Sequence, residues 1–223
     1  MKAAPALPRL LAVPSNASAS LSRTALVALT KMLAGSSVRW VGCEPSTRQR
    51  LYFANHTSHL DALVLWTALP PAARLLARPV AARDYWQAGQ LRQHLAIDVF
   101  NAVLIDRHPA ADAPRHPLEP LFTALDDPRQ HSLIIFPEGT RGSNLEPAPF
   151  KSGLYHLAKQ RPTVELVPVL IDNMNRILPK GELLPVPLLG GVSFGPPMQL
   201  QPGEGKAAFL TRARDAVIAL GAA

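Results

Sequence analysis

Apolar and polar positions alternate along this chain in blocks that predict strands and helices in turn. Short apolar runs such as "RLYFA", "SLIIF" and "VELVPVLI" predict buried strands, whereas longer stretches with apolar positions three or four residues apart predict helices. The strands are expected at 38–42, 50–54, 74–81, 101–105, 132–136, 164–171 and 190–194. The helices are expected at 59–69, 84–95, 117–126, 151–160 and 205–220, after an amphipathic helix at 21–34.

This alternation predicts an α/β domain with a mixed, largely parallel sheet of about seven strands flanked by helices. In such sheets, binding sites gather beyond the carboxyl ends of the strands. Three polar clusters directly follow predicted strands: Asn55–Asp61, Asp106-Arg107 and Pro137–Arg141. We therefore expect the functional site at that edge of the sheet.

The N-terminal segment has a different character. In the predicted helix 21–34, Leu21, Ala25, Ala28, Leu29 and Met32 share one face. Residues 1–43 carry five basic side chains and no acidic one. Such a helix suits a membrane interface, or it packs on its own domain, and the pattern alone does not separate the two. We divide the chain into a basic segment, 1–36, and the α/β domain, 37–223.

Composition narrows the classes of partner. The 223 residues carry a formal net charge of +7, which favours an anionic partner such as nucleic acid, a membrane surface or a phosphorylated substrate. Aromatic residues make up only 6%, and no basic run is interleaved with them, so we expect no nucleic-acid partner. No apolar run reaches the ~18 residues of a membrane span. The single cysteine, Cys43, excludes an intrachain disulfide.

The stretch "NHTSHLD" holds the densest polar chemistry. If residues 56–61 were all helical, His56 and Asp61 would point about 140° apart, so His56 should precede the helix. Ser58 then becomes the N-cap, with Asp61 at the third helical position. Asp61 can there accept a proton from one imidazole nitrogen and leave the other as a base. Plain helix capping, or His56 and His59 as metal ligands, are the alternatives, but no third ligand stands at a suitable spacing.

Two further segments carry candidate chemistry. In "LIIFPEGTRGSN", Pro137 ends a buried strand, and Gly139 and Gly142 allow a tight turn with exposed N–H groups. Arg141 presents a planar fork that suits phosphate, and Lys151 in "FKSG" adds a cation at the start of a helix. Taken singly, each segment is also compatible with a generic turn, and "VLIDR" with a surface salt bridge.

Together the segments resemble a known family. "NHTSHLD", "VLIDR", "FPEGTR" and "VPVLI", in this order, are similar to the four motifs of the glycerolphosphate acyltransferase superfamily, and most of all to bacterial 1-acyl-sn-glycerol-3-phosphate acyltransferases. The matched stretch covers about 51–171. The resemblance implies that His56 is the base, that Asp61 orients it, and that an apolar groove takes the acyl chains. It further implies an acceptor site made of Arg107, Glu138, Gly139, Thr140 and Arg141, to which we add Lys151.

The resemblance also implies a reaction. A fatty acyl group would pass from acyl-CoA or acyl carrier protein to the sn-2 hydroxyl of 1-acyl-sn-glycerol 3-phosphate (lysophosphatidic acid), giving phosphatidic acid in phospholipid synthesis. Because a thioester is already activated, we expect no metal and no other cofactor. The expected location is peripheral, at a phospholipid surface on the cytoplasmic face of the inner membrane. Another lipid alcohol as acceptor, a thioester or lipid hydrolase, and a non-catalytic lipid-binding module are the alternatives.

Two features depart from many members of that family. Gly142 stands where a serine often follows the arginine, and the N-terminal region offers an amphipathic helix where a membrane span is common. The first changes little, and the second leaves the mode of membrane attachment open.

A rival motif lies near the C-terminus. "GVSFG", Gly191–Gly195, matches the G-x-S-x-G elbow of hydrolases, which requires a following helix and a later histidine. Pro196-Pro197 follows at once, and the last histidine is His156. We therefore interpret Ser193 as a strand residue. An acyl-enzyme through Ser58 is conceivable, although its base would have to be the crowded His56.

Overall fold

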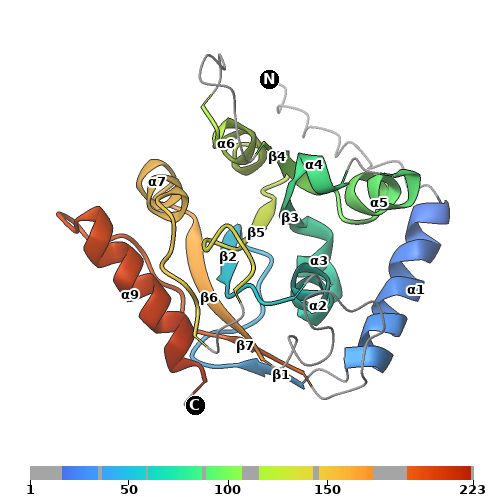
Figure 1. The fold of residues 1–223 in the computed structure, drawn as a ribbon, viewed down its shortest axis with the longest axis horizontal. Helices are drawn as coiled ribbons and strands as arrows, with labels where there is room; N and C mark the ends of the chain where they lie inside the picture. The colour runs from blue at the N-terminus through green and yellow to red at the C-terminus, as the bar shows by residue number, and fades with distance from the viewer. Residues whose placement is uncertain are drawn as a thin grey trace, which may run out of the picture.

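The structure is a computed structural model that describes residues 17–34, 37–58, 60–86, 89–106, 116–142, 146–172 and 190–221. At its centre lies a seven-stranded sheet in the order β1-β7-β6-β2-β5-β3-β4 (Figure 1). The strands are β1 (Ser37–Trp40), β2 (Arg50–Ala54), β3 (Ala77–Ala82), β4 (Val103–Ile105), β5 (Ser132–Ile135), β6 (Glu165–Asp172) and β7 (Gly191–Phe194). All neighbouring strands run parallel except β6 and β7. The predicted mixed, largely parallel sheet is confirmed.

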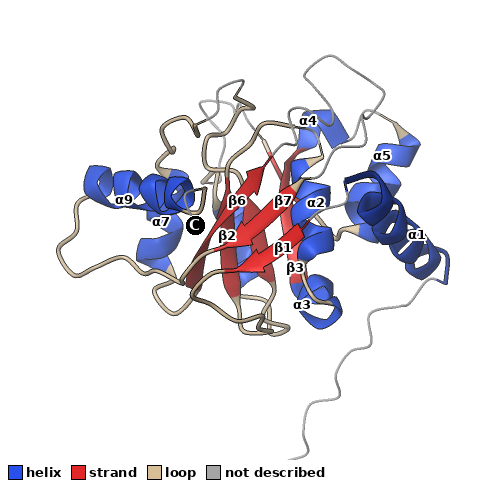
Figure 2. Ribbon diagram, turned by 90° about the horizontal axis from the view of Figure 1, so that it is seen from below, coloured by secondary structure: helices blue, strands red, loops and turns tan. Residues whose placement is uncertain are grey.

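Helices cover both faces of the sheet, which is why its central strands, β2 and β5, are apolar after their first residue. Every residue of β2 and β5 is buried, as expected for parallel strands packed on both sides. Leu51 and Phe53 of β2 enter the core formed with α6 (Glu119–Leu125), α7 (Gly153–Gln160) and α9 (Lys206–Ala219). Tyr52 enters the opposite core with α2 (Asp61–Ala68), and Figure 2 shows the sheet between α7 and α9 on one side and α2 on the other.

Two predicted segments differ from the structure in their type of secondary structure or its continuity, beyond shifts at their ends. The expected helix 84–95 is replaced by α4 (Arg83–Trp86), α5 (Gln90–His94) and a π-helix, η1 (Leu95–Val99). Gly89, before α5, has a φ of 137°, which side chains rarely permit, so a continuous helix does not pass through it. The expected strand 74–81 begins only at Ala77, because α3 (Pro71–Leu76) occupies its first part with a proline in the first helical turn.

The N-terminal helix α1 (Ala17–Ala34) packs on the domain through a face that its hydrophobic pattern did not mark. Leu26 and Val27 contact the core beside α2, and the Arg23 guanidinium donates hydrogen bonds to the carbonyls of Asp98 (2.7 Å) and Val99 (2.9 Å). Four residues of the predicted apolar stripe, Leu21, Ala25, Ala28 and Leu29, face outward instead, with Leu21 72% exposed. No helix in the described part of the chain combines the length and apolar composition needed to cross a bilayer.

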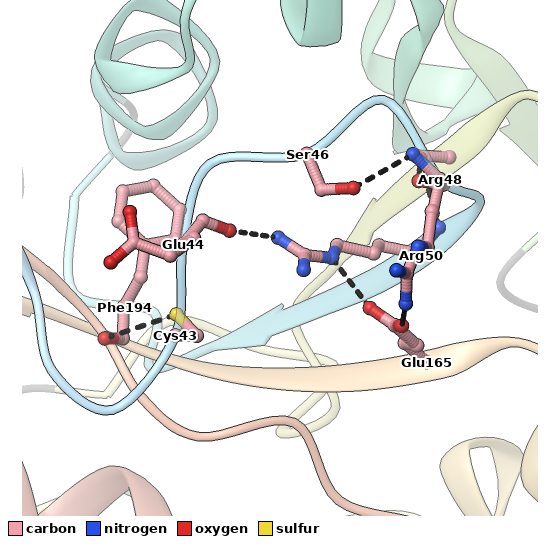
Figure 3. Close-up of polar contacts among 8 residues, drawn as sticks. Cys43, Glu44, Ser46, Arg48, Arg50, Glu165 and Phe194 are labelled. Atoms are coloured by element: carbon pink, nitrogen blue, oxygen red, sulfur yellow. Dashed lines mark hydrogen bonds and ion pairs between the residues drawn. The ribbon is translucent and has the colours of Figure 1, made fainter.

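The loop from β1 to β2 is fastened across the sheet at the start of β2 (Figure 3). Arg50 donates to the Glu165 carboxylate at 2.8 Å and to the Glu44 carbonyl at 2.8 Å, and Arg48 donates to Glu165 at 3.1 Å. Burial alone would raise the pKa of Glu165, but hydrogen bonds from the two arginines hold that pKa below its usual value. This cluster fixes one end of the strand whose other end leads to His56.

Candidate active site

The chain leaves β2 at Asn55, whose side chain continues the sheet. Its carboxamide donates to the Ile171 carbonyl at 2.9 Å and accepts from the Ile171 N–H at 2.8 Å. These two bonds imitate a peptide group pairing with β6, and the side chain is buried. The backbone of the next residue, His56, is thereby fixed in relation to the sheet.

His56 and Asp61 form the predicted pair. His56 Nδ1 lies 2.9 Å from Asp61 Oδ2, which also accepts the N–H groups of Thr57 at 2.6 Å and Ser58 at 2.8 Å. Because this oxygen accepts two backbone N–H groups, it faces Nδ1 as an acceptor, so in this arrangement Nδ1 is the donor and Nε2 keeps the lone pair. The Asp61 side chain is 0% exposed and that of His56 22% exposed. Among the described residues nothing hydrogen-bonds Nε2, so this nitrogen can act as a base.

The predicted cap at Ser58 is only partly formed, because α2 begins at Asp61 with Leu60 as its N-cap residue and without a side-chain cap hydrogen bond. Ser58 Oγ accepts the Leu60 N–H at 3.3 Å, and the Ser58 N–H returns to the Asp61 carboxylate. In a capping box the serine hydroxyl would accept the Asp61 N–H, whereas here it accepts the Leu60 N–H, so only the return hydrogen bond to the Asp61 carboxylate matches that motif. Ser58 is 2% exposed, which argues against this hydroxyl as an acyl-accepting nucleophile.

The segment after β5 lies against His56 because β5 is the parallel neighbour of β2. The Phe136 ring stacks on the imidazole, with 4.3 Å between centroids and 23° between planes. The Gly142 N–H donates to the His56 carbonyl at 2.9 Å. Gly139 turns the chain between them with a φ of 72°, in the region that favours glycine. The strand order thus brings the first and third polar clusters together.

The residues predicted to bind the acceptor separate into two environments. Gly139, Thr140 and Lys151 are exposed and Arg141 is half-buried. The Lys151 ammonium lies over Gly139, since a Cβ built on this glycine would stand 2.6 Å from Lys151 Nζ. The Glu138 carboxylate, by contrast, points inward and is buried.

The remaining predicted positions lie apart or outside the described residues. Arg107 is outside them, and so is His59. Asp106 follows β4, two strand positions (about 10 Å) from β5. Its carboxylate makes an exposed ion pair with Arg83 at 2.9 Å. Within the described residues, no three His, Cys, Asp or Glu side chains gather as a metal site requires.

Ser193 is a strand residue, as predicted. It lies in β7, is 1% exposed, and its Oγ accepts a hydrogen bond from Arg39 Nε at 3.1 Å. The hydrolase elbow is therefore excluded here.

Sequence reasoning missed three interactions that position His56: the pairing of the Asn55 amide with Ile171, the stacking of the Phe136 ring and the hydrogen bond to the Glu138 carboxylate. Asn55 was grouped with the polar cluster without a role, and Phe136 was assigned to the buried strand, which ends at Ile135. An apolar residue directly before the strand-ending Pro137 was the available signal for Phe136.

Comparison with known proteins gives consistent matches. A sequence model of the family described as Acyltransferase matches residues 38–172. The 1-acyl-sn-glycerol-3-phosphate acyltransferase alpha of Mus musculus is 32% identical over 138 residues, covering 62% of this chain and 45% of the mouse protein. The 1-acyl-sn-glycerol-3-phosphate acyltransferase of Limnanthes alba is 30% identical over 169 residues, covering 74% of this chain and 56% of the plant protein. The chain thus spans about half the length of these relatives.

A solved structure shares the fold. The crystal structure of the 1-acyl-sn-glycerophosphate (LPA) acyltransferase PlsC from Thermotoga maritima superposes with a TM-score of 0.66. It is 20% identical, and the match covers 95% of this chain and 83% of that one. At this identity the likeness bears on the fold, and it agrees with the sheet and flanking helices described above.

Proposed function

Because the chain belongs to the Acyltransferase family, we propose that it transfers a fatty acyl group from an acyl thioester to the sn-2 hydroxyl of 1-acyl-sn-glycerol 3-phosphate. The product would be phosphatidic acid. One observation carries the proposal: His56 Nδ1 lies 2.9 Å from the buried Asp61 carboxylate, beside the loop that follows β5. Relatives that bear the name of this activity give further support.

The proposed chemistry uses the substrate's own hydroxyl as nucleophile. His56 Nε2 takes the proton from the sn-2 hydroxyl while its oxygen attacks the thioester carbonyl. The tetrahedral intermediate then collapses, the C–S bond breaks, and the imidazolium returns the proton to the departing thiolate. Asp61 stabilises the imidazolium between these steps. General-base help of this kind contributes about 10²–10⁴-fold to the rate.

The acceptor phosphate would lie against the rim formed by Gly139, Thr140, Arg141 and Lys151. A guanidinium offers paired donors to phosphate oxygens, and an ammonium adds a mobile point charge. Arg107 stays a prediction for the same site. Acyl-CoA or acyl carrier protein would be the co-substrate, and the chemistry requires no metal or other cofactor because the thioester is already activated.

The lipid substrate implies a membrane surface as partner, and we propose peripheral attachment at the cytoplasmic face of the inner membrane. The outward face of α1 supports this, since Leu21 is 72% and Leu29 46% exposed while the same helix is held to the domain by Arg23. Apolar side chains on one exposed helix face can enter the headgroup region.

One experiment separates this proposal from its alternatives. Purified protein is incubated with radiolabelled acyl-CoA, with and without lysophosphatidic acid, in mixed micelles. Label that enters phosphatidic acid only when the acceptor is present supports the proposal. Free fatty acid regardless of acceptor would indicate a hydrolase, and no turnover would indicate a binding module. Other lysolipids and acyl carrier protein, tested in the same format, define the acceptor and donor.

A further inference from the structure

The backbone of His56 is held by the segment that follows β5, in addition to the contact of its ring with Asp61. The His56 N–H donates to Glu138 Oε1 at 2.7 Å, and the His56 carbonyl accepts the Gly142 N–H at 2.9 Å. Phe136 covers one face of the ring. One short segment therefore contacts the peptide groups on both sides of His56 as well as the imidazole.

The Glu138 carboxylate is the centre of this arrangement. Its second oxygen, Oε2, accepts the Ala148 N–H at 2.8 Å, and the residue is 4% exposed. Both oxygens thus face backbone N–H donors from separate parts of the chain. Hydrogen bonds to an ionised acceptor are roughly twice as strong as neutral ones, and a buried carboxylate requires such partners.

We propose that Glu138 is a positioning residue that holds His56 in register with the acceptor site, and that it is not a ligand of the acceptor. This inference rests on the proposed function of His56 as the base. Both carboxylate oxygens are already engaged inside the protein, and a negative charge would repel the phosphate of the acceptor. The neighbouring Gly139 and Thr140, which are exposed, remain on the acceptor side.

Replacing Glu138 by glutamine keeps the shape of the side chain but removes one of its two hydrogen bonds to backbone N–H groups. The carboxamide can accept only through its oxygen, so its NH₂ group must face either the His56 N–H or the Ala148 N–H, both of which are donors. His56 is then released, or held while the segment around Ala148 moves away. A displacement of about 1 Å at a reacting group lowers the rate about 100-fold, so we expect a loss of kcat of about 10- to 100-fold.

Steady-state kinetics test the assignment against acceptor binding. Glu138→Gln should lower kcat by that factor and leave the KM for lysophosphatidic acid within about twofold, because only the base is displaced. Arg141→Ala, at the acceptor rim, should instead raise this KM. Glu146→Gln is the matched control. Glu146 lies on the same segment between β5 and α7 as Glu138, but its carboxylate is exposed and pairs with Arg214 at 3.0 Å. A raised acceptor KM with unchanged kcat in Glu138→Gln would overturn the proposal.

A spectroscopic readout needs no turnover. The proton shared by His56 Nδ1 and Asp61 should give a downfield proton resonance, identified by its loss in His56→Ala. We expect Glu138→Gln to shift or broaden this resonance and Glu146→Gln to leave it unchanged. If the resonance responds but the wild type transfers no acyl group, the proposed function fails and the positioning role stands. If wild type transfers but the resonance is indifferent to Glu138→Gln, the positioning role fails.

A second variant keeps the proposal testable if Glu138→Gln does not fold. Ala148→Pro deletes the other N–H bound by Glu138 and leaves the carboxylate itself in place. With the fold verified by circular dichroism, kcat should fall less than in Glu138→Gln and the acceptor KM should stay unchanged. A wild-type kcat in a folded Ala148→Pro protein would contradict the positioning of His56 by Glu138.

Discussion

Asn55→Asp is the substitution whose cost the structure defines most closely. The change replaces one NH₂ group by an oxygen and leaves the size of the side chain unchanged. The new carboxylate still accepts the Ile171 N–H, but its second oxygen faces the Ile171 carbonyl oxygen. In the wild type, the Asn55 NH₂ group donates to this carbonyl at 2.9 Å. A lost hydrogen bond and an unsatisfied buried carbonyl together cost about 2–4 kcal/mol, with charge repulsion placing the value toward the upper end.

For a domain of this size, such a loss lowers the melting temperature by about 4–16 °C. Differential scanning calorimetry at pH 8 measures it, with Asn101→Asp, the same chemical change at an exposed position, as control. Because Asn55 also fixes the strand end that carries His56, kcat should fall in the protein that remains folded. A melting temperature within 2 °C of wild type, where ~2 °C corresponds to no more than about 1 kcal/mol, would refute the peptide-like role of the amide.

Three further outcomes are expected. Gly139→Ala should raise the acceptor KM and lower stability, because the new Cβ would stand 2.6 Å from Lys151 Nζ. Gly203→Ala is the control: its φ of 76° brings the same backbone strain, but no atom lies within 4 Å, so the acceptor KM should stay unchanged. Burial lowers the pKa of His131 in the folded protein. The contribution of His131 to the free energy of unfolding should therefore be constant above the unfolded-state pKa of about 6.5 and decline as the pH falls below it. Urea titrations over this pH range measure the decline, and His131→Gln should remove this contribution. Leu21→Glu should weaken co-sedimentation with anionic vesicles, whereas Leu75→Glu, at a 67% exposed position on α3, should not; equal binding of both variants would place the attachment elsewhere.

The sequence predicts well those features that depend on neighbouring residues. Strand β2 matches its expected bounds because a short apolar run, Leu51–Ala54, flanked by polar residues leaves little freedom of assignment. The His56–Asp61 pair also depends on nearby residues, since it forms only when His56 precedes the helix; the spacing left plain capping open, and the four motifs together favoured the pair. The break at Gly89 and the helix at Pro71 carried signals too, but the apolar pattern ran through both.

Contacts that depend on strand order were beyond sequence reasoning. Asn55 contacts β6 and Phe136 contacts His56 because β6 and β5 flank β2, and no local pattern fixes that order. The resemblance assigned Glu138 to the acceptor site, and only the fold brings the His56 N–H onto its carboxylate. For helix α1 the pattern left two orientations open; Leu21 and Leu29 of its apolar stripe face outward, while Arg23 and a less marked face hold the helix to the domain.

The central claim is that His56, oriented by Asp61, is the base in acyl transfer. Its most direct test is kcat for acyl transfer to lysophosphatidic acid in His56→Ala at saturating substrates, with circular dichroism matching wild type. The account predicts a loss of at least about 10²–10⁴-fold, with Asp61→Asn severely impaired as well. A folded His56→Ala protein that keeps the wild-type kcat would contradict it.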